Sequence, residues 1–429
     1  MKKKTLTIIM AIIIMLTGII TLTACSGRDS DLEFVLLPCE TSYSVRARII
    51  PPRWFGASPS RVRVARTVTI PNTHNGLPVT HIYGFNDQSR LRTITIPKSV
   101  IHIGDDAFAW SRNLRTINGM QGVLYIGARA FRNNSFSSFS LPPNLTSIGE
   151  QAFLQTNYWT PGTENFVLAA GGGLSEIFIP QTVSHIGDAA FAGNGNLSYI
   201  EVASNNQYFV SANGILFNID KTRLIAFPTG RTETYYSIPG TVSQISAKAF
   251  FGSSLTSVTI PSGVMEIRNQ AFNDTPLFRN SPADSFVYAD RWVVGINNDL
   301  GTILSSTINF VFRDDTVGIA TNSIVPNPLG HLTIPYSVRH ISPAAFINVP
   351  QQLTSLAFER PASSGITQFG IYSFSDSLTA GTFKLIATSS IYVPCEDSKA
   401  EYSALINAIR ERFSGFGWSH SPCVIRVRT

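Results

Sequence analysis

The residues best able to do chemistry in this 429-residue chain include histidines that recur at one place in related segments. His102, His185 and His340 each stand one residue before an isoleucine, an arrangement that could place imidazoles in a shared metal centre. Related segments between them carry Tyr125 and Gln244 at that place. We therefore interpret this shared position, which forms one column when the repeats are aligned, as facing solvent. We expect neither a metal nor another cofactor.

Paired acids and enzyme motifs give no stronger signal. Asp105 and Asp106 are candidate calcium ligands, but the equivalent pairs at 150–151 and 247–248 do not keep two carboxylates. The sequence contains no G-x-S-x-G, no H-E-x-x-H and no phosphate-binding G-x-x-x-x-G-K motif. It thus favours a protein that is not an enzyme. A catalytic site in the inserted segments described below is a minor alternative.

Cys25 has the most specific chemistry in the chain. It follows three lysines at 2–4, an apolar run over 6–22 and two small residues. This order is typical of a signal peptide, and the cysteine directly after it resembles the lipobox of bacterial lipoproteins. We expect residues 1–24 to be the signal peptide and Cys25 to carry lipid, so that the exported chain is anchored to a bacterial membrane at the cell surface or outer membrane. An uncleaved transmembrane anchor is the alternative, because the run is nearly long enough to span a bilayer.

Three further cysteines remain after Cys25, an odd number for an oxidising compartment. Cys395 and Cys423 flank a terminal segment and are a candidate disulfide, with the unpaired state equally open. If they pair, Cys39 is either a small buried residue or a free thiol.

Composition excludes two classes of protein. The chain is 44% hydrophobic and 14% charged and contains 28 phenylalanines, so it must bury apolar surface and is not disordered. The net charge of +6 falls to +3 without the three N-terminal lysines. Such a weak charge excludes a nucleic-acid partner.

The elements that position these residues come from an internal repeat. An Ile/Leu-Pro pair is followed by Val or Leu, then by Ile, and then by Ala-Phe, always with 11 residues from Pro to Phe. The copies occupy 96–108, 141–153, 179–191, 238–250, 260–272 and 334–346. Weaker copies end at Phe85 and Phe131. When they are counted, the phenylalanines at 85, 108, 131 and 153 lie 22–23 residues apart, as do those at 250 and 272, a period typical of a leucine-rich-repeat solenoid. Longer gaps indicate insertions over 154–173, 204–233 and 275–322, expected to be loops, hairpins or decayed repeats.

Each repeat predicts two short strands and a turn. Ile94 and Ile96 alternate with polar residues as in a half-buried strand, and Pro97 ends that strand because proline cannot donate to a ladder. A second strand points Ile103 inward, and the following turn buries Phe108. Stacking aligns these phenylalanines into a spine that no single repeat can bury alone.

These repeats closely resemble the BspA-like leucine-rich repeats of bacterial surface proteins over 67–394. The resemblance implies a mainly β solenoid with inserted β-hairpins and a binding or adhesion function. The partners that it implies are host or extracellular-matrix proteins, or other bacterial surface proteins. The cysteine that often follows Ala-Phe in the family is absent here. A structural cell-envelope protein that binds components of the same cell is the alternative function.

Both ends of the solenoid need caps. Residues 25–66 are expected to form an N-terminal β cap, and 395–429 a C-terminal cap with an apolar-striped helix over 398–413. Six arginines and no acids lie between 41 and 66. They indicate either a strand with one solvent-exposed face or a patch that rests against anionic lipid headgroups.

Candidate ligand contacts are aromatic residues in a column otherwise rich in Ser and Thr. Phe178 lies two residues before a Pro in this column, and Tyr199 and Glu201 are expected on the neighbouring strand. The insertions add Trp159 and Trp292. We expect protein ligands to contact these five residues, although the 154–173 insertion could instead cover Phe178 and the tryptophans could pack their own hairpins.

Overall fold

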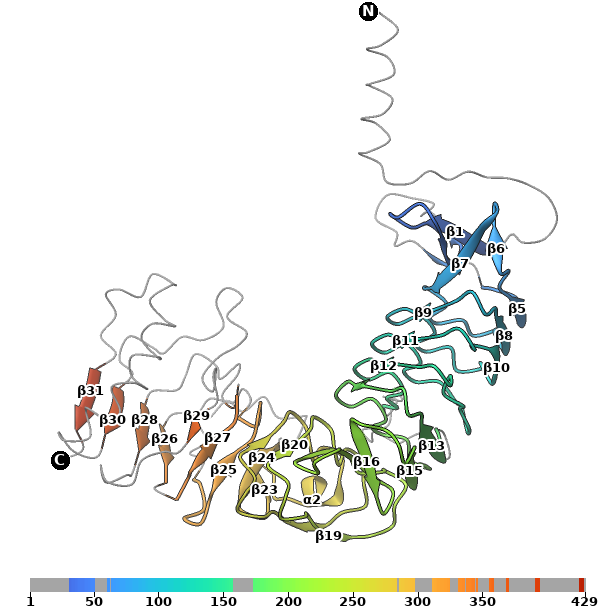
Figure 1. Ribbon diagram of the computed structural model, residues 1–429. Coiled ribbons are helices and arrows are strands. Elements are labelled where there is room, and N and C mark those ends of the chain that lie inside the picture. Colours follow the sequence, from blue (N-terminus) through green and yellow to red (C-terminus); the bar gives the residue numbers. More distant parts are fainter. Residues whose placement is uncertain are drawn as a thin grey trace, which may run out of the picture. The chain divides into compact units, whose positions relative to one another are not determined.

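Short strands of successive repeats align into narrow parallel sheets (Figure 1). The computed structural model describes residues 31–50, 60–61, 63–156, 173–283, 285–297, 311–324, 331–335, 337–343, 345, 355–358, 368–369, 390–393 and 424–427. The chain divides into two units. Unit 1 comprises residues 1–155 and 182–190, and unit 2 comprises residues 156–181 and 191–429. The described residues confirm a mainly β solenoid with coils of about 23 residues.

The long sheet of unit 1 begins with a hairpin and continues through one short strand per coil. Its order is β1-β2-β7-β9-β11-β12-β14, with β6 paired to β7. The strands are β1 (Leu32–Leu36), β2 (Tyr43–Ala47), β6 (Thr73–His74), β7 (Leu77–Ile82), β9 (His102–Ile103), β11 (Tyr125–Ile126), β12 (Ser147–Ile148) and β14 (His185–Ile186). Because β2 is antiparallel to β1 and parallel to β7, the β1–β2 pair covers the first coil, as expected of a β cap.

A second sheet of unit 1 has the order β10-β8-β5. It contains β5 (Thr67–Thr69), β8 (Thr93–Ile96) and β10 (Thr116–Gly119), and β3 (Ile49–Ile50) and β4 (Ser60–Arg61) form a separate antiparallel pair. In β8 the expected alternation holds, since Ile94 and Ile96 are buried while Thr93 and Thr95 are only half-buried.

Phenylalanines form the predicted spine between the sheets of unit 1. The ring centroids of Phe85 and Phe108 are 5.6 Å apart, those of Phe108 and Phe131 5.4 Å, and those of Phe131 and Phe153 5.3 Å. All four side chains are at most 2% exposed. The repeat period therefore places each aromatic ring directly against its successor.

Unit 2 is built from coils of the same kind. Its strands are β13 (Glu176–Ile179), β15 (Tyr199–Val202), β16 (Phe209–Ala212), β17 (Ile215–Asn218), β18 (Arg223–Ala226), β19 (Tyr235–Ser237), β20 (Gln244–Ile245), β21 (Ser257–Thr259), β22 (Glu266–Ile267), β23 (Ser285–Ala289), β24 (Trp292–Asn297), β25 (Gly318–Ile319), β26 (His331–Ile334), β27 (His340–Ile341), β28 (Ser355–Phe358), β29 (Gln368–Phe369), β30 (Ser390–Val393) and β31 (Val424–Val427). One short helix, α2 (Pro276–Arg279), begins after the N-cap Thr275.

Two insertions form the expected β-hairpins. β16 and β17 are antiparallel, and so are β23 and β24. The 204–233 insertion ends in a decayed repeat, because β18 joins β20 in parallel and the Phe227 ring lies 5.3 Å from that of Phe250. An inserted hairpin thus re-enters the solenoid as an ordinary coil.

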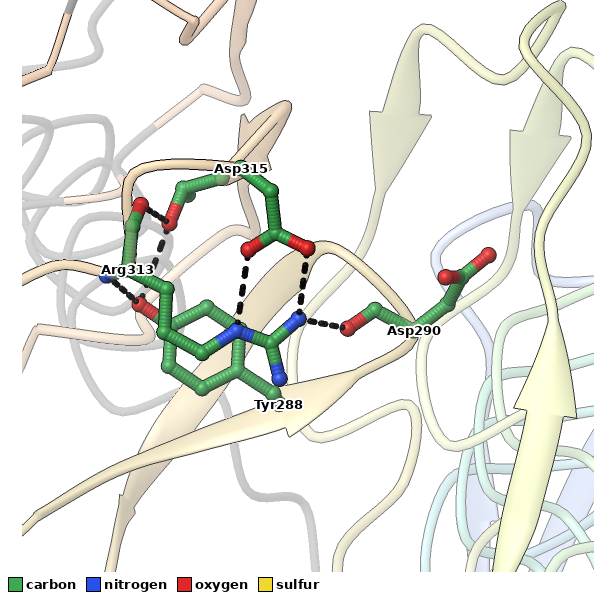
Figure 2. Close-up of polar contacts among 5 residues, drawn as sticks. Tyr288, Asp290, Arg313 and Asp315 are labelled. Atoms are coloured by element: carbon green, nitrogen blue, oxygen red, sulfur yellow. Dashed lines mark hydrogen bonds and ion pairs between the residues drawn. The ribbon is translucent and has the colours of Figure 1, made fainter.

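Arg313 ties the second hairpin to the chain that follows it (Figure 2). Its guanidinium lies over the Tyr288 ring, 4.1 Å from the ring centroid. Nη2 of Arg313 donates to the Asp290 carbonyl at 2.8 Å, and Nε donates to the Asp315 carboxylate at 3.1 Å. The Tyr288 hydroxyl accepts from the Arg313 amide at 2.9 Å. The cluster therefore fixes the β23–β24 turn against residues 313–315.

The last described strand, β31, pairs in parallel with β30. The expected helix over 398–413 lies outside the described residues. Within the part of the chain that the structure describes, no helix has the length and apolar character needed to cross a bilayer.

Candidate binding surface on β13 and β15

Four alternating side chains of β13 and β15 form one exposed patch. The parallel register sets Glu176 opposite Tyr199 and Phe178 opposite Glu201. Isoleucines between them are buried, so these four side chains share the outer face. Aromatic rings occupy one diagonal of this square and carboxylates the other. We call it the aromatic–acid patch.

The rings of this patch are open to solvent. Phe178 is 48% exposed and Tyr199 is 47% exposed, although both are large and apolar enough to be buried in most proteins. Exposed aromatic side chains beside charges are typical of binding hot spots. The structure therefore shows Phe178, Tyr199 and Glu201 together, on neighbouring strands as expected.

The β16–β17 hairpin of the 204–233 insertion supports the patch from one side. The Ile200 amide donates to the Gly214 carbonyl at 3.0 Å, and the Ser211 hydroxyl donates to the Ile200 carbonyl at 2.5 Å. Gly214 lies in the β16–β17 turn, beneath the Tyr199 ring. The insertion thus holds β15, and with it Tyr199, in a fixed position.

The chemistry of the patch suits a cation. Ring faces attract ammonium and guanidinium groups, most strongly when the cation is desolvated. Glu176 and Glu201 add carboxylates that a guanidinium can bind with two hydrogen bonds. The arrangement can therefore hold an arginine or lysine side chain.

Trp292 differs from the sequence-based expectation. It is 2% exposed, and its ring stacks on that of His340 with centroids 5.8 Å apart. A β-carbon at Gly318 would lie 2.5 Å from the indole. Trp292 therefore packs in the core and offers no contact surface, because β24 joins the sheet of the following coil.

The other expected sites have different outcomes. Cys25, Trp159, Cys395 and Cys423 lie outside the described residues. Cys39 is an exposed free thiol, not a buried one. The Thr41 hydroxyl donates to Cys39 Sγ at 3.2 Å, and such hydrogen bonds lower the pKa of the thiol from 9.0 to about 7.

Sequence reasoning missed a ring-lined groove in unit 1. His81 and His102 have ring centroids 5.1 Å apart, and Tyr125 follows at 6.0 Å from His102. With Ser147 and His185 they line a groove of about 420 Å³. Burial lowers the pKa of both His81 and His102, and therefore favours neutral imidazoles.

The signal that could have revealed this groove is strand register. His81 lies in the opening hairpin, before the first full motif, but pairs with His102. The expectation of a solvent-facing column holds for His185, which is exposed, whereas His102 is half-buried. Among the described residues, no group of three His, Cys, Asp or Glu is placed to hold a metal ion.

Comparisons with solved structures found bacterial leucine-rich-repeat proteins. A leucine-rich repeat protein from Eubacterium ventriosum is 21% identical, with a TM-score of 0.44 over 83% of this chain and 96% of that one. The pneumococcal vaccine antigen PcpA is 20% identical, with a TM-score of 0.44 over 88% and 95%. A leucine rich cell surface protein from Faecalibacterium prausnitzii is 18% identical, with a TM-score of 0.37 over 89% and 98%. No curated protein matches the sequence.

The repeats themselves are matched by a family description. Six copies of the BspA type leucine rich repeat region cover residues 67–161, 163–213 and 225–288. These ranges contain the phenylalanine spine and the aromatic–acid patch. These repeats therefore belong to the BspA-type leucine-rich-repeat family.

Proposed function

We propose that this protein is a non-catalytic, lipid-anchored adhesion protein at the bacterial surface. The exposed aromatic–acid patch carries the proposal, because two rings and two carboxylates on a rigid sheet form a binding surface for basic side chains of a protein. Family membership supports a surface-binding role. Host or extracellular-matrix proteins, or surface proteins of other bacteria, are the partners that this role implies.

The patch explains how such binding would be specific. An arginine that stacks on Phe178 or Tyr199 also meets Glu176 or Glu201 on the adjoining corner. The sheet of the solenoid holds the four side chains at fixed spacings. Binding therefore costs little conformational entropy for ordering them. The 204–233 insertion, whose hairpin lies beside the patch, would supply further contacts, as loops on a rigid scaffold commonly do.

Substitutions in the patch test this proposal. We expect Phe178→Ala and Glu201→Gln each to weaken binding to a captured matrix protein by about tenfold or more, the factor that corresponds to a modest hot spot. Tyr125→Ala is the matched control, since Tyr125 is 46% exposed on a different sheet. Surface plasmon resonance against a panel of matrix proteins, beginning with fibronectin, gives the affinities.

Two outcomes would overturn the proposal. Equal affinities for the patch variants and the control would place the binding site elsewhere. Capture of envelope components of the same cell, with no affinity for any matrix or foreign surface protein, would favour a structural envelope role instead.

The lipid anchor is tested separately. Lipobox chemistry needs a thiol at Cys25, so Cys25→Ala should abolish incorporation of a fatty-acid analogue and leave the precursor uncleaved. Cys39→Ala removes the exposed thiol and should keep full labelling. Equal labelling of the Cys25 variant would contradict lipidation at this position.

A further inference from the structure

We propose that unit 1 carries a second binding site, independent of the aromatic–acid patch, for an anionic polysaccharide. The site consists of Arg66, Arg92 and Arg115, which we call the arginine column, and of the adjacent groove around Trp110. Two independent features carry the proposal. They are a stack of like charges and a bulky residue in a strained backbone conformation.

The arginine column is fixed by strand register. Thr67 and Thr116 both pair with Thr93, so the residues directly before them also align. The Arg92 amide donates to the Arg66 carbonyl at 2.8 Å, and the Arg115 amide donates to the Arg92 carbonyl at 2.9 Å. All three side chains are exposed.

Such a column opposes folding. Neighbouring strands lie about 4.8 Å apart, and like charges directly opposite each other destabilise a sheet. Within the described residues, no carboxylate is paired with any of the three guanidinium groups. Arg115 instead donates to the Ser135 carbonyl at 2.9 Å.

The coil itself does not require arginine at this place. Strands of unit 2 carry small uncharged residues there, namely Ser175, Ser198, Thr234 and Thr256. A repulsive column confined to three successive coils is therefore explained by a partner that brings negative charges at a similar spacing.

Trp110 is the second feature. It has φ 64°, in the left-handed region that strongly disfavours bulky side chains. At the equivalent place after other phenylalanines of the repeat, the residues that also have a positive φ are of types that tolerate it, namely Asp87, Asn133, Gly193, Gly252 and Asp274. Trp110 is half-buried and is not part of the phenylalanine spine, to which this coil contributes Phe108. Strained residues of this kind concentrate at binding sites.

The indole lies among polar and basic groups. Arg112 and Arg132 place their guanidinium carbons 5.4 Å and 5.8 Å from the ring centroid. Trp110, Arg112, Asp87, Ser89 and Asn113 line a groove of about 610 Å³. Asn113 is only two residues before Arg115, so the groove and the arginine column adjoin along one coil.

This combination identifies the class of ligand. An aromatic ring face packs on the C–H face of a sugar ring, and guanidinium groups bind sulfate or carboxylate groups. The Asp87 carboxylate and the Asn113 amide suit sugar hydroxyls. A linear polymer matches a column that runs across successive coils.

The arginine column is tested with dextran sulfate, and uncharged dextran is the ligand control. Changing all three arginines to glutamine should weaken binding to the full chain by about fivefold per arginine, or about a hundredfold in total. The matched variant changes Arg279, Arg291 and Arg339, three exposed arginines of unit 2, to glutamine and should bind as the wild type does. Equal losses in the two variants would overturn the proposal.

Trp110→Asn separates binding from folding. Asparagine tolerates φ 64°, so the melting temperature should stay or rise while the affinity for dextran sulfate falls about tenfold or more. Binding to polyglutamate, which has no sugar rings, should depend on the arginines but not on Trp110. Unchanged dextran sulfate affinity with a lower melting temperature would make Trp110 structural. Binding to phosphatidylglycerol vesicles without binding to dextran sulfate would make this face a membrane contact.

Discussion

The Tyr199 ring lies so close over Gly214 that a β-carbon at position 214 would come within 2.6 Å of Tyr199 Cδ2. Gly214 also has φ +80°, a conformation that other residues rarely adopt. One glycine in an inserted hairpin thus meets two demands. It makes the β16–β17 turn, and it leaves space for an aromatic side chain of the aromatic–acid patch.

Gly214→Ala should therefore affect both stability and binding. The positive φ alone should lower the free energy of unfolding by about 1–2 kcal/mol, and the clash should displace Tyr199 from the patch. We expect affinity for the protein ligand to fall together with stability. Urea unfolding and the binding assay measure the two effects.

Two glycines separate backbone strain from crowding. Gly76 has φ +81°, but a β-carbon added there would have no neighbouring atom within 4 Å, so Gly76→Ala introduces strain alone. Gly240 has neither feature, and Gly240→Ala should be nearly neutral. If Gly214→Ala lowers the free energy of unfolding by no more than Gly76→Ala does and leaves ligand affinity unchanged, the contact between Gly214 and Tyr199 contributes nothing to binding.

Phe250→Ala tests the spine. The Phe250 ring is fully buried, and its centroid lies 5.3 Å from that of Phe227 and 4.8 Å from that of Phe272. Its removal should lower the free energy of unfolding by about 3–5 kcal/mol through lost burial and a cavity. His185→Ala, on an exposed position, should change it by no more than about 0.5 kcal/mol.

Trp292→Ala distinguishes a core residue from a ligand contact. Because the indole is 2% exposed and stacked on His340, we expect destabilisation of about 3–5 kcal/mol. Any loss of ligand affinity should disappear when binding is measured well below the melting temperature of the variant. A stable variant with weakened binding would restore Trp292 as a contact residue.

The repeat could be predicted from sequence because its physics is local and periodic. Pro97 ends a strand and Phe108 enters the core through side-chain patterns that recur every coil. The repeat motif does not include Phe227, because a hairpin stands before it in place of the usual Ile-Pro segment. Only strand pairing and ring stacking identify it as a member of the spine.

The candidate sites were less predictable, since they depend on which coils become neighbours. Alternation correctly placed Phe178, Tyr199 and Glu201 on one face. The burial of the Trp292 side chain depends on how the β23–β24 hairpin pairs with the next coil, and no local sequence pattern specifies that pairing. His81 lies before the first full repeat, so its contact with His102 depends on register alone.

Burial of these two histidines should make stability depend on pH. Burial lowers the pKa of His81, with a smaller contribution from His102, and burial also lowers the pKa of His102 although Asp105 acts in the opposite direction. Unfolded histidines titrate near pH 6.5. The folded state then binds fewer protons than the unfolded state just below this pH, so stability is retained above pH 6.5 and is lost as pH falls through the folded pKa values.

We therefore expect the free energy of unfolding to decrease between pH 7.5 and pH 5. In the double variant His81→Gln/His102→Gln this decrease should be smaller, because two groups that resist protonation in the folded state are gone. Urea titrations at intervals of half a pH unit measure the slope, and identical slopes for wild type and double variant would show that the ring contacts do not couple folding to protonation.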